Sequence, residues 1–230
     1  MMTSDKTSMR IFILGATGGI GRELVDQALR RGRRVTAFVR APRKLGAPHE
    51  GLTIVQGDPV SAEAMSASLA GHDAVLSALG PPGPGRTTIV SAGARAAVAA
   101  MGKGGVRRLL IVGVAVLFED AGFVAALLRR TLLRNIAADS AEMERIVRAS
   151  DLDWTIVRPP RLTNGPMTRR YAVREDHLPP GSGGMATVSR GDVAHFLLDE
   201  VEHPAHVRRV VGMAYAKSAM RPTHEARSTV

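Results

Sequence analysis

Three regularly spaced glycines follow the first apolar segment of the chain. Residues 15–21 read Gly-Ala-Thr-Gly-Gly-Ile-Gly, after a strand-like run and before a helical pattern. Such a turn uses glycine to bend tightly and to let the backbone approach a pyrophosphate, which the N–H groups of the following helix bind. Glycine-rich turns also arise from packing alone, but the flanking strand and helix are the context that the motif requires. The predicted dinucleotide contacts are Gly15, Thr17, Gly18, Gly19, Ile20 and Gly21.

The end of the second predicted strand carries cations. In this class of turn an acidic residue there bonds the ribose 2′-hydroxyl of NAD, whereas an arginine accommodates the 2′-phosphate of NADP. Arg40 occupies the position, and Arg43 and Lys44 follow it. We therefore expect NADP as the cofactor, with NADPH preferred over NADH. The alternative is a solvated basic loop without a cofactor preference.

Two later strand ends lie on the expected path of the same ligand. Asp58 follows the third predicted strand and is a candidate partner for the adenine amino group. Leu79, Gly80 and Pro81 leave the fourth predicted strand at the carboxyl edge of the sheet, where open α/β sheets bind ligands. These residues join the predicted cofactor contacts.

Apolar β-rich runs alternate with helical patterns, which is typical of a parallel sheet built from βαβ units. The fold class is therefore α/β, with a Rossmann-type doubly wound parallel sheet, helices on both faces, and a single domain with small C-terminal substrate-side elements. The predicted strands are 10–14, 34–39, 52–55, 74–79, 108–112, 154–157 and 209–213. The predicted helices are 21–31, 61–69, 89–101 and 189–200.

Two segments depart from this alternation. Residues 123–136 carry apolar and arginine side chains at helical spacing and predict one amphipathic helix, inserted at about 119–137. It would pack on the core or cover a substrate or partner. Residues 159–184 are rich in Pro, Gly and Arg, which predicts a substrate-side loop with a short strand near Tyr171. We expect the domain to span 1–216 and the tail 217–230 to be flexible.

Composition narrows the class of protein. Of 230 residues, 45% are apolar and 23% charged, a balance that supports one globular core. The absence of cysteine excludes disulfides and thiolate chemistry. No run is long and apolar enough for a membrane span, and the first residues lack a secretory pattern, so we expect a cytoplasmic protein without a membrane partner.

The formal charge of +10 raises the question of a nucleic-acid partner. Most basic residues form separated pairs where helices should end, and cations there are favoured by the helix dipole. No aromatic and basic residues interleave, so we expect no nucleic-acid binding. His203 and His206 have Pro204 between them and no third ligand at suitable spacing, so no metal site is predicted.

Motifs along nearly the whole chain resemble the atypical short-chain dehydrogenase/reductase group that contains biliverdin-IXβ reductase/flavin reductase and has NmrA-like relatives. The matching segments are 15–18, 39–40, 56–58, 87–95, 154–162 and 189–194. The resemblance implies that Arg40 and Lys44 hold the 2′-phosphate. It also implies that Gly80, Pro81, Arg161 and Leu162 line the cofactor or substrate cleft, with Gly113 near the nicotinamide. Such proteins reduce flavins or linear tetrapyrroles by hydride transfer from NADPH.

Two departures from related enzymes leave the catalytic side chain unassigned. The Tyr-x-x-x-Lys proton-donor pair is absent, because Tyr171 and Tyr215 are followed four residues later by Glu175 and Ala219. The hydroxyl that commonly follows strand five is missing from Val-Gly-Val-Ala at 112–115. Flavin reduction needs chiefly proximity and orientation and tolerates both losses better than ketone reduction does.

The expected activity is therefore reduction of a small conjugated acceptor by a monomer or homodimer. Two alternatives stay open. One is an NmrA-like dinucleotide-binding redox sensor without catalysis. The other is an isomerase, epimerase or carbonyl reductase on the same fold.

Overall fold

A computed structural model describes residues 8–46, 48–81, 83, 85–119, 122–182 and 186–215, with the side chains of 122–125 left out. The predicted tail at 217–230 lies outside the described residues.

One eight-stranded sheet organises the described chain, in the order β3-β2-β1-β4-β5-β6-β10-β8. All neighbours pair in parallel except β8, which runs antiparallel to β10 at one edge. The predicted doubly wound parallel sheet is confirmed. Its strands are β1 (Arg10–Leu14), β2 (Arg34–Val39), β3 (Leu52–Gln56), β4 (Ala74–Ser77), β5 (Arg108–Val112), β6 (Asp153–Arg158), β8 (Ala172–Glu175) and β10 (Arg209–Ala214).

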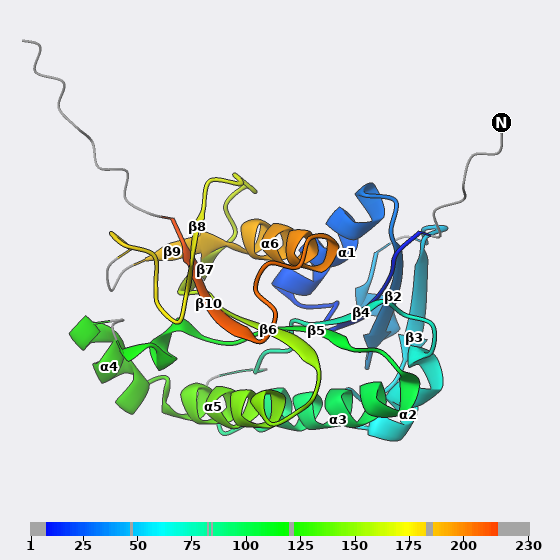
Figure 1. Ribbon diagram of the computed structural model, residues 1–230, viewed down its shortest axis with the longest axis horizontal. Coiled ribbons are helices and arrows are strands. Elements are labelled where there is room, and N and C mark those ends of the chain that lie inside the picture. The colour runs from blue at the N-terminus through cyan, green and yellow to red at the C-terminus, as the bar shows by residue number, and fades with distance from the viewer. Residues whose placement is uncertain are drawn as a thin grey trace, which may run out of the picture.

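Helices cover both faces of this sheet (Figure 1). α1 (Gly19–Arg30) and α6 (Arg190–Glu202) pack together on one face. The opposite face carries α2 (Ala62–Leu69), α3 (Ile89–Gly104) and α5 (Arg134–Arg148). The remaining elements are α4 (Gly122–Arg130), the short 3-10 turns η1 (Pro42–Lys44) and η2 (Ala115–Leu117), and a parallel pair of strands, β7 (Arg161–Thr163) and β9 (Thr187–Ser189).

The central strands are apolar on both faces because helices cover both. Along β1, Ile11 and Ile13 pack with the α1 and α6 layer, while Phe12 and Leu14 pack with the α2, α3 and α5 layer. All four side chains are buried completely. Near-continuous apolar runs are typical of such doubly covered parallel strands.

The predicted single helix at 123–136 is wrong. The chain forms α4 and α5 instead, separated at residues 131–133, and the hydroxyl of Thr131 donates back to the Leu127 carbonyl at 2.8 Å. Leu132, one of the apolar residues of the predicted helix, lies in the turn between α4 and α5 and is 68% exposed. The sequence reading missed α5 because its buried face includes Asp139, Ser140 and Glu144 among apolar residues.

Smaller corrections concern element ends near the expected ligand. α1 begins at Gly19, two residues before the predicted start, so the third glycine of the turn lies inside the helix. β4 ends at Ser77 rather than at Leu79, which leaves Ala78 and Leu79 in the following loop. β7, inside the predicted loop, and β9 were not predicted, whereas the short strand near Tyr171 is confirmed as β8.

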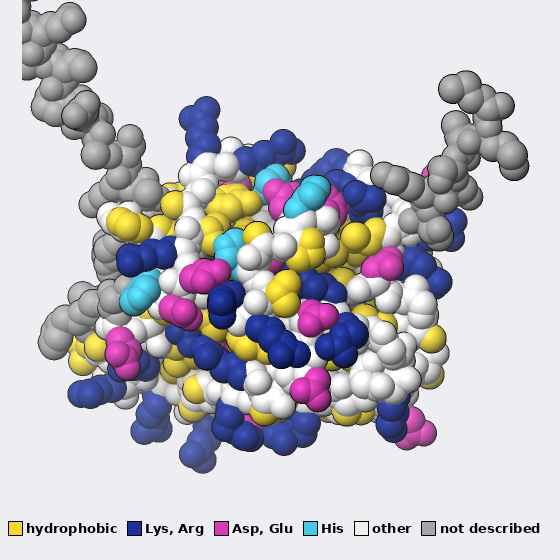
Figure 2. Space-filling view, viewed as in Figure 1, with side chains coloured by type: hydrophobic (Ala, Val, Ile, Leu, Met, Phe, Trp, Pro, Cys, Tyr) yellow, Lys and Arg dark blue, Asp and Glu magenta, His cyan; other side chains and the backbone are white. Residues whose placement is uncertain are grey.

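Basic side chains are spread over the face shown in Figure 2, with acidic and apolar side chains among them. Some arginines of the chain hold two helices together. Arg31 and Arg33, at the end of α1, both pair with Glu202 of α6, and Arg31 also pairs with Asp199. In the described part of the chain, no helix combines the length and apolar character needed to cross a membrane.

A buried ion pair joins β5 to the end of α6. Arg108 donates to Glu200 at 3.0 Å, and the two side chains are 11% and 3% exposed. The same carboxylate accepts the backbone N–H groups of Ala205 and His206 and contacts the His206 ring. Glu200 therefore links the strand, the helix and the turn into β10.

We predict that Glu200→Ala lowers the free energy of unfolding by about 3–5 kcal/mol, because Arg108 would stay buried without its partner charge. Glu142→Ala removes a carboxylate from the exposed pairs with Arg95 and Arg145 and should lower the free energy of unfolding far less, because solvent screens these charges. Urea unfolding of both variants measures the difference. Similar losses in the two variants would contradict the structural role given to Glu200.

Candidate dinucleotide-binding site

The turn between β1 and α1 closes because it has glycine at two crowded positions. Gly15 has φ +77°, and a Cβ on it would lie 2.6 Å from the backbone carbonyl carbon of Ala78, the first residue after β4. A Cβ on Gly21 would overlap the carbonyl oxygen of Gly15. The Gly18 N–H donates to that same oxygen at 2.9 Å. Side chains at 15 or 21 would therefore push α1 away from the sheet.

The N-terminus of α1 is left open for an anion. Gly18 is its N-cap and provides no side-chain hydrogen bond, and the first turn contains no acidic residue. The first N–H groups of a helix have no acceptor within the helix, and its dipole favours negative charge there. Gly18 and Gly19 are both exposed. The arrangement suits a phosphate, as the sequence predicted.

A pocket of about 130 Å³ lies beside this turn. Its lining comes from the ends of β1, β2 and β4, and the sheet order reverses between β1 and β4. In open α/β sheets this reversal leaves a crevice at the carboxyl edge, where dinucleotides bind. Its lining residues are Gly15, Thr17, Gly18, Phe38, Val39, Arg40, Pro59, Ala78, Leu79, Gly80 and Ile89.

Six predicted contacts thus share one pocket, namely Gly15, Thr17, Gly18, Arg40, Leu79 and Gly80. Gly19, Ile20 and Gly21 form the adjacent first turn of α1. Asp58 is exposed next to Pro59 of the lining, and its carboxylate accepts the Val60 N–H. Pro81 follows Gly80 and is half-buried outside the lining residues.

Lys44 lies in η1 and lines a different pocket with Arg22 and Arg43. Arg22 nevertheless connects that turn to the glycine turn, because its guanidinium donates to the carbonyls of Thr17 and Lys44, both at 3.2 Å. The sequence reading did not single out Arg22. This link fixes the loop that follows Arg40 relative to the start of α1.

Gly113 lies deeper, at the end of β5. It is buried, its N–H donates to Val157 at 2.8 Å, and a Cβ on it would lie 3.4 Å from the Glu144 carboxylate. Glu144 accepts two hydrogen bonds from Arg158, at 2.7 and 2.6 Å, and both side chains are nearly buried. The Arg158 guanidinium also stacks 4.5 Å from the Phe118 ring centre. This pair ties α5 to the strand ends beside the expected nicotinamide position.

Arg161 and Leu162 lie on β7. Arg161 is exposed, whereas Leu162 packs against the apolar cluster of the α1 and α6 layer. Neither residue lines the glycine-turn pocket. The structure therefore places these two predicted cleft residues apart from the six that share the pocket.

Both tyrosines are held in networks around α6. Tyr215 donates to Asp192, which also accepts the N–H groups of Thr168 and Arg169. Burial disfavours the charge on Asp192, but these hydrogen bonds outweigh it and lower the pKa of the carboxyl. Tyr171 contacts the His195 ring at 2.8 Å, and burial raises the pKa of its phenol. Neither tyrosine has a lysine four residues later.

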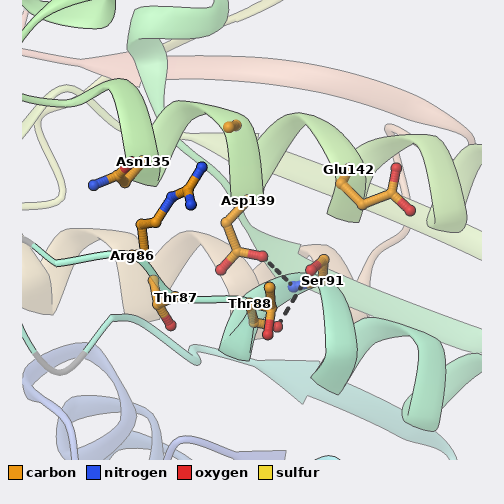
Figure 3. Close-up of a pocket in the computed structure, with 8 residues that line it drawn as sticks. Arg86, Thr87, Thr88, Ser91, Asn135, Asp139 and Glu142 are labelled. Carbon is orange, nitrogen blue, oxygen red and sulfur yellow. Dashed lines mark hydrogen bonds between the residues drawn. The ribbon is translucent and has the colours of Figure 1, made fainter.

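A second pocket, of about 500 Å³, lies between α3 and α5 (Figure 3). Its lining includes Arg86, Asn135 and Asp139 and shares no residue with the glycine-turn pocket. Asp139 accepts the N–H groups of Val90 and Ser91 at 3.1 and 3.0 Å, so it caps α3 from α5. Both hydrogen bonds of the Asp139 carboxylate therefore join α5 to the start of α3.

Arg190 is another residue that the sequence reading did not assign to the site. It is the first residue of α6, and its side chain lies against Gly19 of the glycine turn. The signal available in the sequence was Ser189, which caps α6 by accepting the Asp192 N–H at 3.0 Å and so fixes where Arg190 begins the helix. Nothing local in the sequence indicates that α6 begins beside α1.

Comparison with known proteins identifies the family of the chain. Residues 15–204 match a family model described as NAD(P)H-binding. The chain is 28% identical over 206 residues to the uncharacterized protein YwnB of Bacillus subtilis strain 168, covering 86% of this chain and 94% of YwnB.

Solved structures share the whole fold. A Bacteroides thetaiotaomicron structure, provisionally assigned as an epimerase, is 26% identical and superposes with a TM-score of 0.78 over 92% of this chain and 99% of its own. A Streptococcus pneumoniae TIGR4 structure, provisionally assigned as an NADH-flavin reductase, is 23% identical with a TM-score of 0.74 over 90% and 100%, a likeness of fold alone. The chain therefore belongs to the NAD(P)H-binding family of Rossmann-type proteins.

Proposed function

We propose that this protein is an NADPH-dependent reductase that passes hydride to a flat conjugated acceptor such as a flavin or a linear tetrapyrrole. The observation that carries the proposal is the single pocket at the strand-order reversal, which brings Arg40 together with Gly15, Thr17 and Gly18. A glycine turn for the pyrophosphate and a cation for the ribose phosphate are the two features that NADP requires of such a pocket.

The residues present fit the cofactor. The cradle at Gly15 and Gly21 leaves no room for a Cβ, and the open N-terminus of α1 suits a pyrophosphate. Arg40 is exposed at the end of β2, so its guanidinium is free to take a 2′-phosphate. When bound, the nicotinamide would supply the hydride. The protein's contribution is to position the two reactants and to exclude water from between them.

The side chains available for proton transfer indicate which class of acceptor the site could reduce. Both tyrosines are engaged around α6, and among the described residues the lysines are Lys44, on η1, and Lys103, near the end of α3. After β5 the chain presents Val114 and Ala115 instead of a hydroxyl. A ketone would need a positioned donor for its developing alkoxide, whereas a reduced flavin can take its proton from solvent. These residues favour a conjugated acceptor.

The absence of a Tyr-x-x-x-Lys pair and of a hydroxyl after β5 also favours a second candidate. A protein that binds NADPH and reports its level to a partner needs the pocket and no proton donor. The fold is compatible with both functions, because function depends on the site rather than on the architecture. The epimerase assignment of one structural neighbour adds an isomerase as a third candidate.

We predict that Gly18→Val abolishes binding of both NADPH and NADH without unfolding the protein. Gly18 has φ −78°, which valine adopts without strain, and a Cβ there would lie 3.3 Å from the Gly15 carbonyl. The branched side chain would occupy the path of the pyrophosphate. Fluorescence titration with each dinucleotide measures the effect, and circular dichroism controls for folding. A folded variant with wild-type affinity would show that the glycine turn does not contact the dinucleotide.

We also predict that Arg40→Ala weakens NADPH by about 10- to 100-fold and leaves NADH nearly unchanged, because Arg40 would meet the extra phosphate. Calorimetric titration gives both dissociation constants. Arg34→Ala, at the exposed start of the same strand, is the control for loss of one positive charge. Equal losses for the two dinucleotides would refute the assignment of Arg40.

The direct test of the proposed activity is NADPH oxidation, followed by absorbance at about 340 nm, with FMN, FAD, riboflavin and biliverdin offered separately as acceptors. We expect steady turnover with at least one of them. Tight NADPH binding without turnover of any acceptor would contradict the proposed reductase activity and favour the sensor or the isomerase.

A further inference from the structure

Arg190 reaches the glycine turn from the other end of the chain. A Cβ on Gly19 would overlap the Cδ of Arg190 and lie 2.6 Å from its Nε, so the side chain crosses the exposed surface of Gly19. This contact is possible because α1 and α6 pack side by side on one face of the sheet (Figure 1). The side-chain amide of Gln27, in the second half of α1, donates to the Gly191 carbonyl at 2.9 Å and fixes the start of α6 against α1.

The Arg190 side chain is held in place without being neutralised. Its Nη1 donates to the amide oxygen of Asn164, which follows β7, at 2.5 Å. Within the described ranges Arg190 forms no ion pair, unlike Arg31, Arg108 and Arg158. Its position at the start of α6 is fixed by the Ser189 cap and by the hydrogen bonds of the buried Asp192. An oriented cation thus lies against the first residue of α1, and no described carboxylate forms an ion pair with it.

We propose that Arg190 is a second phosphate-binding element that clamps the pyrophosphate of the dinucleotide against the start of α1. This inference rests on the proposed function, because it requires a dinucleotide in the glycine-turn pocket. The planar guanidinium can donate two parallel hydrogen bonds to phosphate oxygens. Asn164 acts as a positioning residue, since it holds the guanidinium and does not itself reach the turn in the described contacts.

The proposal separates two arginines by the phosphate each one binds. The pyrophosphate is common to NADH and NADPH, whereas the 2′-phosphate belongs to NADPH alone. Arg190 should therefore increase the affinity for both dinucleotides by the same factor, and Arg40 should set the preference between them. A phosphate-binding role of Arg190 also explains why residue 19 is glycine, because any Cβ there would displace the Arg190 side chain.

The test is calorimetric titration of the full-length chain with NADPH and with NADH. Arg190→Ala should raise both dissociation constants by about 10- to 100-fold and leave their ratio unchanged. Arg190→Lys keeps the charge but loses the two-donor fork, so it should fall between the wild type and the alanine variant. Arg174→Ala, an exposed arginine of β8, is the control for charge alone and should bind like the wild type.

Asn164→Ala tests the positioning role through a double-mutant cycle. Alone, it should weaken both dinucleotides by about 3- to 10-fold, because the guanidinium loses its anchor. Added to Arg190→Ala, it should have no further effect. Independent, multiplying losses would show that Asn164 does not act through Arg190.

The remaining outcomes distinguish failure of the Arg190 contact from failure of the whole cofactor site. Wild-type affinities in Arg190→Ala, or a loss confined to NADPH, would overturn the pyrophosphate contact while leaving the cofactor site in place. Failure of the wild type to bind either dinucleotide would overturn both the site and the clamp. Binding without turnover would overturn only the proposed reductase activity, because the test of Arg190 measures dissociation constants and not turnover.

Discussion

The close approach of Gly21 to the carbonyl oxygen of Gly15 is the constraint on which the site depends. A Cβ at either end of this turn would overlap backbone, so the start of α1 can lie against β1 and β4 only with glycine at both positions. That contact sets the distance between the helix N-terminus and the sheet. It also leaves Gly18 and Gly19 exposed, with helix N–H groups directed at whatever anion occupies the turn.

The sheet order turns this local geometry into a binding site. Because the order reverses between β1 and β4, the loops after β1, β2 and β4 meet at one edge and enclose a pocket that none of them could form alone. The opposite helix layer is tied to the same edge through polar contacts: Asp139 caps α3, and Glu144 holds Arg158. Removing one partner of such a buried contact lowers the free energy of unfolding by more than the contact itself contributes. The reason is that the other polar group stays buried without a hydrogen-bond partner.

Local patterns predicted the sheet and the glycine turn because each depends on residues near in sequence. Strands β1, β2 and β5 have the predicted bounds, since doubly buried parallel strands are apolar throughout. Helix α5 was not predicted because Asp139, Ser140 and Glu144 are buried on its inner face, where distant partners hydrogen-bond the two carboxylates. The contact of Arg190 with Gly19 had no local signal, because it exists only once α6 has packed beside α1.

The most direct test of the central claim is a crystal structure of the protein grown with NADP⁺. We expect pyrophosphate oxygens about 3 Å from the N–H groups at the start of α1, and the 2′-phosphate beside Arg40. A dinucleotide bound elsewhere, for example in the pocket between α3 and α5 that Arg86 lines, would contradict it. So would a ribose phosphate directed away from Arg40.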